Sequence, residues 1–199
     1  MMKIHFKFIL SAVSLLISSV SFSQGLVETE LSTNAVLVKK WNEIRSAGGL
    51  KVASVSDTLE LGTLGILDDF SSDSPYPDSA LWLDSSAYIN RGYPYAPPTI
   101  GVATFDGISK TGYPYNFAAS STSSAVADLL TSKPINLEYT ISPFDSIYFS
   151  FFYQPQGRGN APELGDSLVV QFRAAGVSST WKNVWAKRGS TLNLSDTLR

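Results

Sequence analysis

Cysteine is absent from the chain, and histidine occurs once, at His5. The first absence excludes disulfides, thiolate metal sites, a cysteine nucleophile and a lipoprotein anchor on a lipidated cysteine. His5 lies within the segment interpreted below as an export signal. The mature chain therefore has no imidazole for a catalytic triad, a zinc site or a pH switch near neutrality.

Charge is also scarce. Charged residues make up 16% of the 199 residues, the formal net charge is −2, and no basic run occurs. The electrostatic footprint of a nucleic-acid-binding protein is missing, so we expect no nucleic-acid partner. The sequence also contains no Gly-x-Ser-x-Gly elbow, phosphate-binding loop or dinucleotide fingerprint. These absences predict that the chain is not an enzyme.

The N-terminus has the layout of a secretory signal. Lys3 and Lys7 precede an apolar run at 8–20, and a short Ser-rich stretch ends before Gln24. The run is shorter than the roughly 20 residues of a membrane-spanning helix and is broken by serines. We predict a signal peptide at 1–23, a mature start at Gln24 and no transmembrane span after cleavage. The product is then exported to the periplasm, cell surface or extracellular medium by the export machinery.

The mature chain divides into an N-terminal segment at 24–57 and a β-rich region at 58–199. Leu37, Trp41 and Ile44 have helical spacing, which predicts one short helix over 32–45, capped by Ser32 or Thr33 and ended by Gly48-Gly49. Beyond it, short apolar runs between turn residues are typical of a β-sandwich. The predicted strands are 58–61, 81–89, 100–104, 125–130, 146–153, 167–174 and 181–187. The run at 146–153 is the strongest, and we expect it to be a central strand covered on both faces.

The tetrapeptide Gly-Tyr-Pro-Tyr occurs twice, at 92–95 and 112–115. Aromatic rings held by prolines can form a stacking surface for sugars or peptides. This makes Tyr93, Tyr95, Tyr113 and Tyr115 candidate ligand-binding residues. The alternative is that the two copies rigidify long connections and pack on the edge of the sandwich.

Carboxylates gather in the turns, and Asp68, Asp69 and Asp106 are candidate ligands of a structural calcium ion. Hard oxygen donors at loop ends suit Ca²⁺, although the spacing is not that of an EF-hand. The alternative is that these aspartates cap turns. No other cofactor is expected.

Six sequence blocks occur in an order that resembles one family. They are Leu-Asp-Asp-Phe at 67–70, Leu-Trp-Leu-Asp at 81–84, the Pro-Pro-Thr-Ile-Gly-Val-Ala-Thr-Phe-Asp-Gly run at 97–107, Leu-Thr-Ser-Lys-Pro at 130–134, Phe-Ser-Phe-Phe-Tyr-Gln-Pro-Gln-Gly at 149–157 and Trp-Lys-Asn-Val-Trp at 181–185. The chain resembles the N-terminal domain of Bacteroidetes secreted surface proteins of the type IX secretion and gliding-associated type. That domain is similar to MAM and concanavalin-like jelly rolls.

The resemblance implies a mostly β fold, an antiparallel jelly-roll sandwich preceded by a short helix. Two or three further strands would follow Trp185 in such a jelly roll, so we expect the domain to be incomplete at its C-terminus. The implied function is a non-catalytic secreted or cell-surface module for adhesion, for binding a glycan or protein, or for structural spacing. The alternative is a polysaccharide-active hydrolase on a concanavalin-like sandwich.

Asp followed by Ser or Thr and then an aliphatic residue occurs repeatedly. The hydroxyl residues are Thr58, Ser79, Ser146, Ser167 and Thr197. The pattern resembles the O-glycosylation acceptor of exported Bacteroidetes proteins. Its alternative meaning is a turn that closes before a strand.

Overall fold

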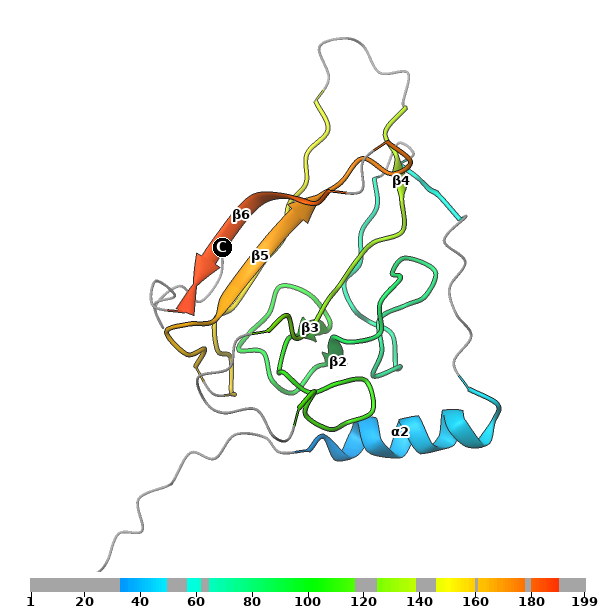
Figure 1. Ribbon diagram of the computed structural model, residues 1–199, viewed down its shortest axis with the longest axis vertical. Coiled ribbons are helices and arrows are strands. Elements are labelled where there is room, and N and C mark those ends of the chain that lie inside the picture. The colour runs from blue at the N-terminus through cyan, green and yellow to red at the C-terminus, as the bar shows by residue number, and fades with distance from the viewer. Residues whose placement is uncertain are drawn as a thin grey trace, which may run out of the picture.

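The structure is a computed structural model that describes residues 33–49, 57–61, 65–116, 125–138, 146–159, 161–177 and 180–189 (Figure 1). The predicted signal peptide at 1–23 lies outside these residues. The elements are α2 (Ala35–Ser46), β1 (Leu59–Glu60), β2 (Tyr88–Asn90), β3 (Val102–Thr104), β4 (Ile135–Asn136), β5 (Ser167–Phe172) and β6 (Lys182–Arg188). Of the described segments, none forms a helix with the length and hydrophobicity that a membrane span requires.

Helix α2 forms where the apolar spacing predicts it, but its cap is different. The N-cap is Asn34, not Ser32 or Thr33, and its Oδ1 accepts hydrogen bonds from the backbone N–H groups of Val36 and Leu37 at 3.1 and 3.3 Å. A side-chain acceptor at this position satisfies N–H groups that have no partner within the helix. The helix ends before Gly48 and Gly49, which both have positive φ.

The strands within the described ranges form three two-stranded sheets. β1 pairs with β4 in parallel, whereas β2 with β3 and β5 with β6 are antiparallel. The β5–β6 hairpin is the longest ladder and has a register shift between Val170 and Gln171. In Figure 1, α2 lies below β2 and β3, and the hairpin lies on the side away from the helix. For the described residues, a β-rich fold with one short helix is confirmed.

Individual strand predictions have mixed outcomes. The strands predicted at 58–61, 100–104, 167–174 and 181–187 appear with adjusted bounds, and only the end of 81–89 is a strand. Residues 125–130 and 146–153 form no strand, so those two predictions are wrong, and β4 was not predicted. A strand exists only where a neighbour offers ladder hydrogen bonds, and the composition of a segment does not supply that neighbour.

The most buried part of the described residues lies where α2 meets the loops around β2 and β3. Leu37, Tyr76 and Ile108 are 0%, 5% and 2% exposed, and Ile44 and Tyr88 pack against them. The Asn34 N–H donates to the Gly112 carbonyl at 2.9 Å, which ties the start of the helix to the second Gly-Tyr-Pro-Tyr copy. The helix is thus part of the same core as β2.

Candidate functional site: a groove and the carboxyl pair behind it

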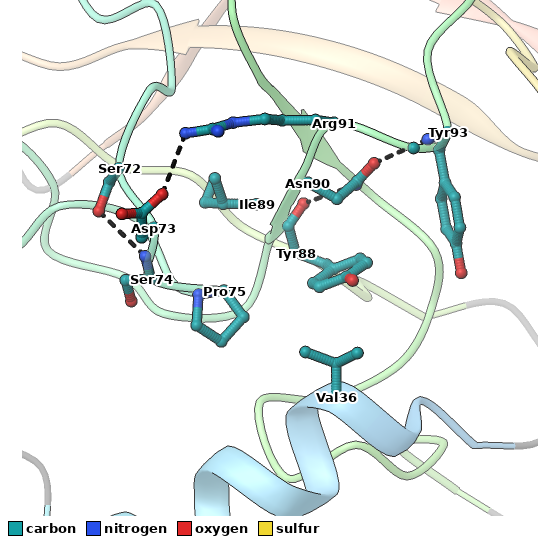
Figure 2. Close-up of a pocket in the computed structure, with 11 residues that line it drawn as sticks. Val36, Ser72, Asp73, Ser74, Pro75, Tyr88, Ile89, Asn90, Arg91 and Tyr93 are labelled. Atoms are coloured by element: carbon teal, nitrogen blue, oxygen red, sulfur yellow. Dashed lines mark hydrogen bonds and ion pairs between the residues drawn. The ribbon is translucent and has the colours of Figure 1, made fainter.

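A groove of about 360 Å³ opens between the start of α2, the turn at 72–75 and the end of β2 (Figure 2). Val36 lines it from the helix, and residues 88–93 line it from β2 and the loop that follows. This volume is at the lower end of the range for small-molecule sites. Its walls combine aromatic rings with serine hydroxyls and an ion pair.

The turn at 72–75 is built by serine side chains. The Ser72 hydroxyl accepts from the Ser74 N–H at 3.2 Å, and the Ser74 hydroxyl accepts from the Tyr76 N–H at 3.1 Å. The Ile89 N–H then donates to the Pro75 carbonyl at 3.0 Å, which attaches the turn to β2. Such local side-chain bonds hold a loop in a defined shape without secondary structure.

The polar end of the groove is the Arg91–Asp73 pair. Arg91 Nη2 donates to the Ser71 carbonyl at 2.6 Å and lies 3.2 Å from Asp73 Oδ1 (Figure 2). The two side chains are 52% and 97% exposed, so the pair contributes little to folding. Since a guanidinium has five N–H donors, Arg91 can bind a ligand oxygen while it stays anchored to the turn.

The apolar wall of the groove is a pair of tyrosines. The rings of Tyr88 and Tyr93 meet edge to face with centroids 5.7 Å apart. Asn90 links the two residues, because its Oδ1 accepts from the Tyr93 N–H at 2.9 Å and its Nδ2 donates to the Tyr88 carbonyl at 3.3 Å. Burial raises the pKa of both phenols, and the Asp106 charge adds to the rise. Both therefore stay protonated at neutral pH.

Behind these rings lies a carboxyl pair, Asp106 and Asp128. Asp106 Oδ1 accepts from the Ile108 N–H at 3.0 Å. Asp128 accepts from the Gly107 N–H at 2.9 Å and from the Tyr115 hydroxyl at 2.8 Å. Asp106 Oδ2 and the buried Nδ2 of Asn34 make no hydrogen bond of ordinary geometry within the part of the chain that is described, but the Asn34 side chain lies close enough to Asp106 to lower its pKa. Buried polar atoms with incomplete hydrogen bonding reduce stability.

Burial, the largest cause, and the charge of Asp128 together raise the pKa of Asp106 to about 6, against the lowering effect of the Ile108 N–H and the Asn34 side chain. Burial also raises the pKa of Asp128. Because the pKa of Asp106 in the fold lies above its ordinary value of 3.8, the protonated form favours folding. This contribution to stability is complete below about pH 4 and is lost as the pH rises through about 6.

Replacing Asp128 with asparagine tests this coupling. Loss of the charge should lower the pKa of Asp106 from about 6, and that of Tyr115 from about 12, since Asp128 contributes to both shifts. Carbon-13 NMR titration of labelled aspartate and tyrosine measures both values. Asp73→Asn is the control, because Asp73 is fully exposed beside Arg91 and should leave Asp106 unchanged. An Asp106 titration that is the same in both variants would contradict the proximity of the two carboxyls.

The four predicted tyrosines do not gather at one surface. Tyr93 lines the groove. Tyr95 is 63% exposed, exchanges two hydrogen bonds with Gln154 and lies under the Arg158 guanidinium. Tyr113 belongs to the turn that contacts the start of α2 through Gly112, and Tyr115 binds Asp128. The sequence prediction missed Tyr88, although its place near the end of the strand predicted at 81–89 was a usable signal.

The aspartates predicted to bind calcium make turn contacts. Asp68 accepts from the Phe70 N–H at 2.8 Å through Oδ1 and from the Trp82 indole at 2.6 Å through Oδ2. Asp69 accepts from the Ser71 N–H at 3.1 Å, and Asp106 lies in the pair described above. No group of three histidine, cysteine, aspartate or glutamate side chains suited to an ion occurs in the described ranges. Both oxygens of Asp68 are already hydrogen-bonded, so its carboxylate fits an ion poorly, and the calcium site stays a prediction.

The predicted glycosylation positions lie on exposed residues wherever they are described, namely at Thr58, Ser79, Ser146 and Ser167. Thr197 lies outside the described residues. Two of the preceding aspartates act as turn caps: Asp78 accepts from the Ala80 N–H at 2.8 Å, and Asp166 accepts from the Glu163 N–H at 2.8 Å. Turn closure therefore accounts for part of the pattern, and modification stays a prediction.

The chain matches no protein-family model, no curated protein and no solved structure.

Proposed function

We propose that the chain is a non-catalytic, exported cell-surface module that binds a saccharide in the groove between α2 and β2. The observation that carries the proposal is the junction of the Tyr88–Tyr93 ring pair with the Arg91–Asp73 ion pair inside one small groove. A sugar ring presents C–H groups on one face and hydroxyls at its edge. An aromatic wall suits the first, and a guanidinium beside a carboxylate suits the second.

The proposal includes the finer fold and the compartment. The antiparallel β2–β3 and β5–β6 pairs support an antiparallel jelly-roll sandwich, in which β5 and β6 would belong to one sheet, whereas the parallel β1–β4 pair departs from that pattern. Export follows from the signal layout at 1–23 and surface delivery from the family resemblance. Loops that join the strands of such a sandwich commonly carry binding residues, and the groove is built mainly from loops.

A polysaccharide hydrolase is the second candidate, because a carboxyl with a pKa of about 6 is suited to act as a general acid. Hydrolysis requires two carboxyl groups that flank the scissile bond. Asp106 Oδ2 is buried, and Asp128 is hydrogen-bonded to Gly107 and Tyr115. These contacts favour a structural role for the pair. Release of reducing ends from a polysaccharide by the purified chain would instead support hydrolysis.

Binding is tested by titrating the purified chain with a panel of neutral and acidic oligosaccharides. For any saccharide that binds, Tyr93→Ala and Arg91→Ala should each weaken affinity at least tenfold, which corresponds to about 1.4 kcal/mol. Tyr95→Ala is the matched control, because Tyr95 belongs to the same tetrapeptide but does not line the groove. Equal losses in Tyr93→Ala and Tyr95→Ala would place the ligand elsewhere, and binding to no saccharide would contradict the proposed function.

A further inference from the structure

The segment at 146–153 and the β5–β6 hairpin form a layer without a buried residue. Within the described part of 146–189, every side chain is partly or fully exposed. Phe149, Phe151 and Phe172 are 61%, 37% and 48% exposed. At about 200 Å² for a whole residue, these three together expose roughly 300 Å². The largest apolar patch on a typical soluble monomer is about 300–600 Å² and is often functional.

The aromatic side chains of this layer contact one another in a continuous row. Phe149 meets Phe172 edge to face at 5.5 Å, and Phe151 meets Trp185 in the same manner at 5.3 Å. Tyr153 extends the row, with its ring 5.1 Å from that of Trp185. Rings that contact one another over this length form a continuous apolar surface, which another protein layer can cover.

The strand register places lysines at both ends of this row. Val170 lies opposite Trp185, Phe172 opposite Lys182, and Leu168 opposite Lys187. Residues directly opposite one another in an antiparallel pair project from the same face. We call this face, made of Phe149, Phe151, Tyr153, Phe172 and Trp185 with Lys182 and Lys187 at its ends, the aromatic face.

The two ends of the aromatic face differ in charge. The end at Phe172 carries Arg173 and Lys182. The end at Ser167 carries Lys187 and Arg188 together with Glu163 and Asp166, which precede β5. The stretch from Ser167 to Gly189 contains four basic and no acidic residues. A partner that covers this face must therefore bring carboxylates to the Phe172 end.

We propose that the aromatic face binds a second copy of this chain, face to face, with the β5 strands of the two copies antiparallel. This arrangement places the basic Phe172 end of one copy over the end that carries Glu163 and Asp166 in the other. A parallel arrangement would place the two basic ends together, which is unfavourable. The aromatic face is smaller than the roughly 800 Å² per partner of a standard interface, so we expect a reversible dimer whose population depends on concentration.

Sedimentation velocity over a wide range of concentrations tests the proposal on the purified chain. We expect a monomer–dimer equilibrium that Phe149→Ser weakens at least tenfold. Tyr148→Ser is the matched control. Tyr148 is the neighbouring residue, 87% exposed, and belongs to none of the ring contacts among the described residues. Both substitutions replace exposed rings and should leave the far-ultraviolet circular dichroism spectrum unchanged.

A charge exchange tests the antiparallel arrangement. Lys182→Glu alone should weaken the dimer, and Lys182→Glu combined with Glu163→Lys and Asp166→Lys should restore it. A chain that stays monomeric at all concentrations would overturn the proposal. If that monomer also binds the dye 1-anilinonaphthalene-8-sulfonate, and Phe149→Ser removes the binding, the aromatic face is open to a different polypeptide. Equal weakening of the dimer by Phe149→Ser and Tyr148→Ser would also overturn the dimer proposal.

Discussion

Replacing Gly112 with alanine is expected to lower the free energy of unfolding by about 3 kcal/mol, within the range for core overpacking and backbone strain combined. Gly112 has a φ of +85°, and a β-carbon there would lie 2.6 Å from both the Cγ2 and the N of Val38. It would also lie 2.7 Å from the Asn34 carbonyl oxygen. Relief requires the first turn of α2 to move, and that turn carries Val36 into the groove. Saccharide binding should weaken as well.

Gly107→Ala is the control for the Gly112 substitution. Gly107 has a similar φ of +71°, but a β-carbon there would meet nothing within 4 Å. The strain of a left-handed residue alone should reduce stability by only about 1–2 kcal/mol. Urea unfolding at constant pH measures both differences. Equal losses in the two variants would show that the contact with α2 is not as close as the structure has it.

Leu37→Ala is expected to lower the free energy of unfolding by about 2–5 kcal/mol, the usual cost of truncating a fully buried leucine. Leu37 is 0% exposed and packs against Tyr76 and Ile108 in the small core. Few other buried side chains in the described residues can compensate, so the loss is a large fraction of the 5–15 kcal/mol typical of a folded domain.

Val36→Ala is the natural control, since Val36 is the preceding residue and is 52% exposed. We expect it to change stability by less than about 1 kcal/mol. Because Val36 lines the groove, this variant should affect ligand affinity more than stability, whereas Leu37→Ala should do the reverse. Thermal unfolding and a binding titration on both variants give the comparison. Similar unfolding temperatures for the two variants would contradict the assigned core.

Helix α2 could be predicted from the sequence because a helix is a local structure. The spacing of Leu37, Trp41 and Ile44 specifies a face, and the Gly48-Gly49 pair ends it. The predicted cap was one to two positions too early. Ser32, Thr33 and Asn34 are all favoured N-cap residues, so residue type alone could not decide among them. The contact with Gly112, far along the chain, ties the helix start at Asn34 to the rest of the fold.

The structure of the segment at 146–153 could not be predicted in the same way, because a strand, unlike a helix, needs a partner. Its β-branched and aromatic residues satisfy strand propensity, and its rings do reach Phe172 and Trp185, but its backbone lacks a ladder. Register and pairing depend on neighbours that the local sequence does not specify. Expected burial on both faces was wrong for the same reason, since Tyr148 and Phe152 are 87% and 64% exposed.

The groove could be predicted only in part. Tyr93 stood out because of its repeated tetrapeptide, but Ser72, Arg91 and Val36 come from separate segments and form a site only after folding. Asp106 was selected for a metal, whereas the structure gives it a different neighbour, Asp128, and a raised pKa. Proximity of residues more than twenty positions apart is a tertiary property, so sequence spacing could not reveal this pair.

The most direct test of the proposed function is an NMR titration of the purified chain with the best-binding oligosaccharide, followed at the ring carbons of assigned tyrosines. Tyr88 and Tyr93 should shift with the ligand in one saturable transition, and Tyr95 and Tyr113 should stay in place. Shifts confined to Tyr95 or Tyr113, or no shift at any tyrosine, would contradict a binding site in the groove between α2 and β2.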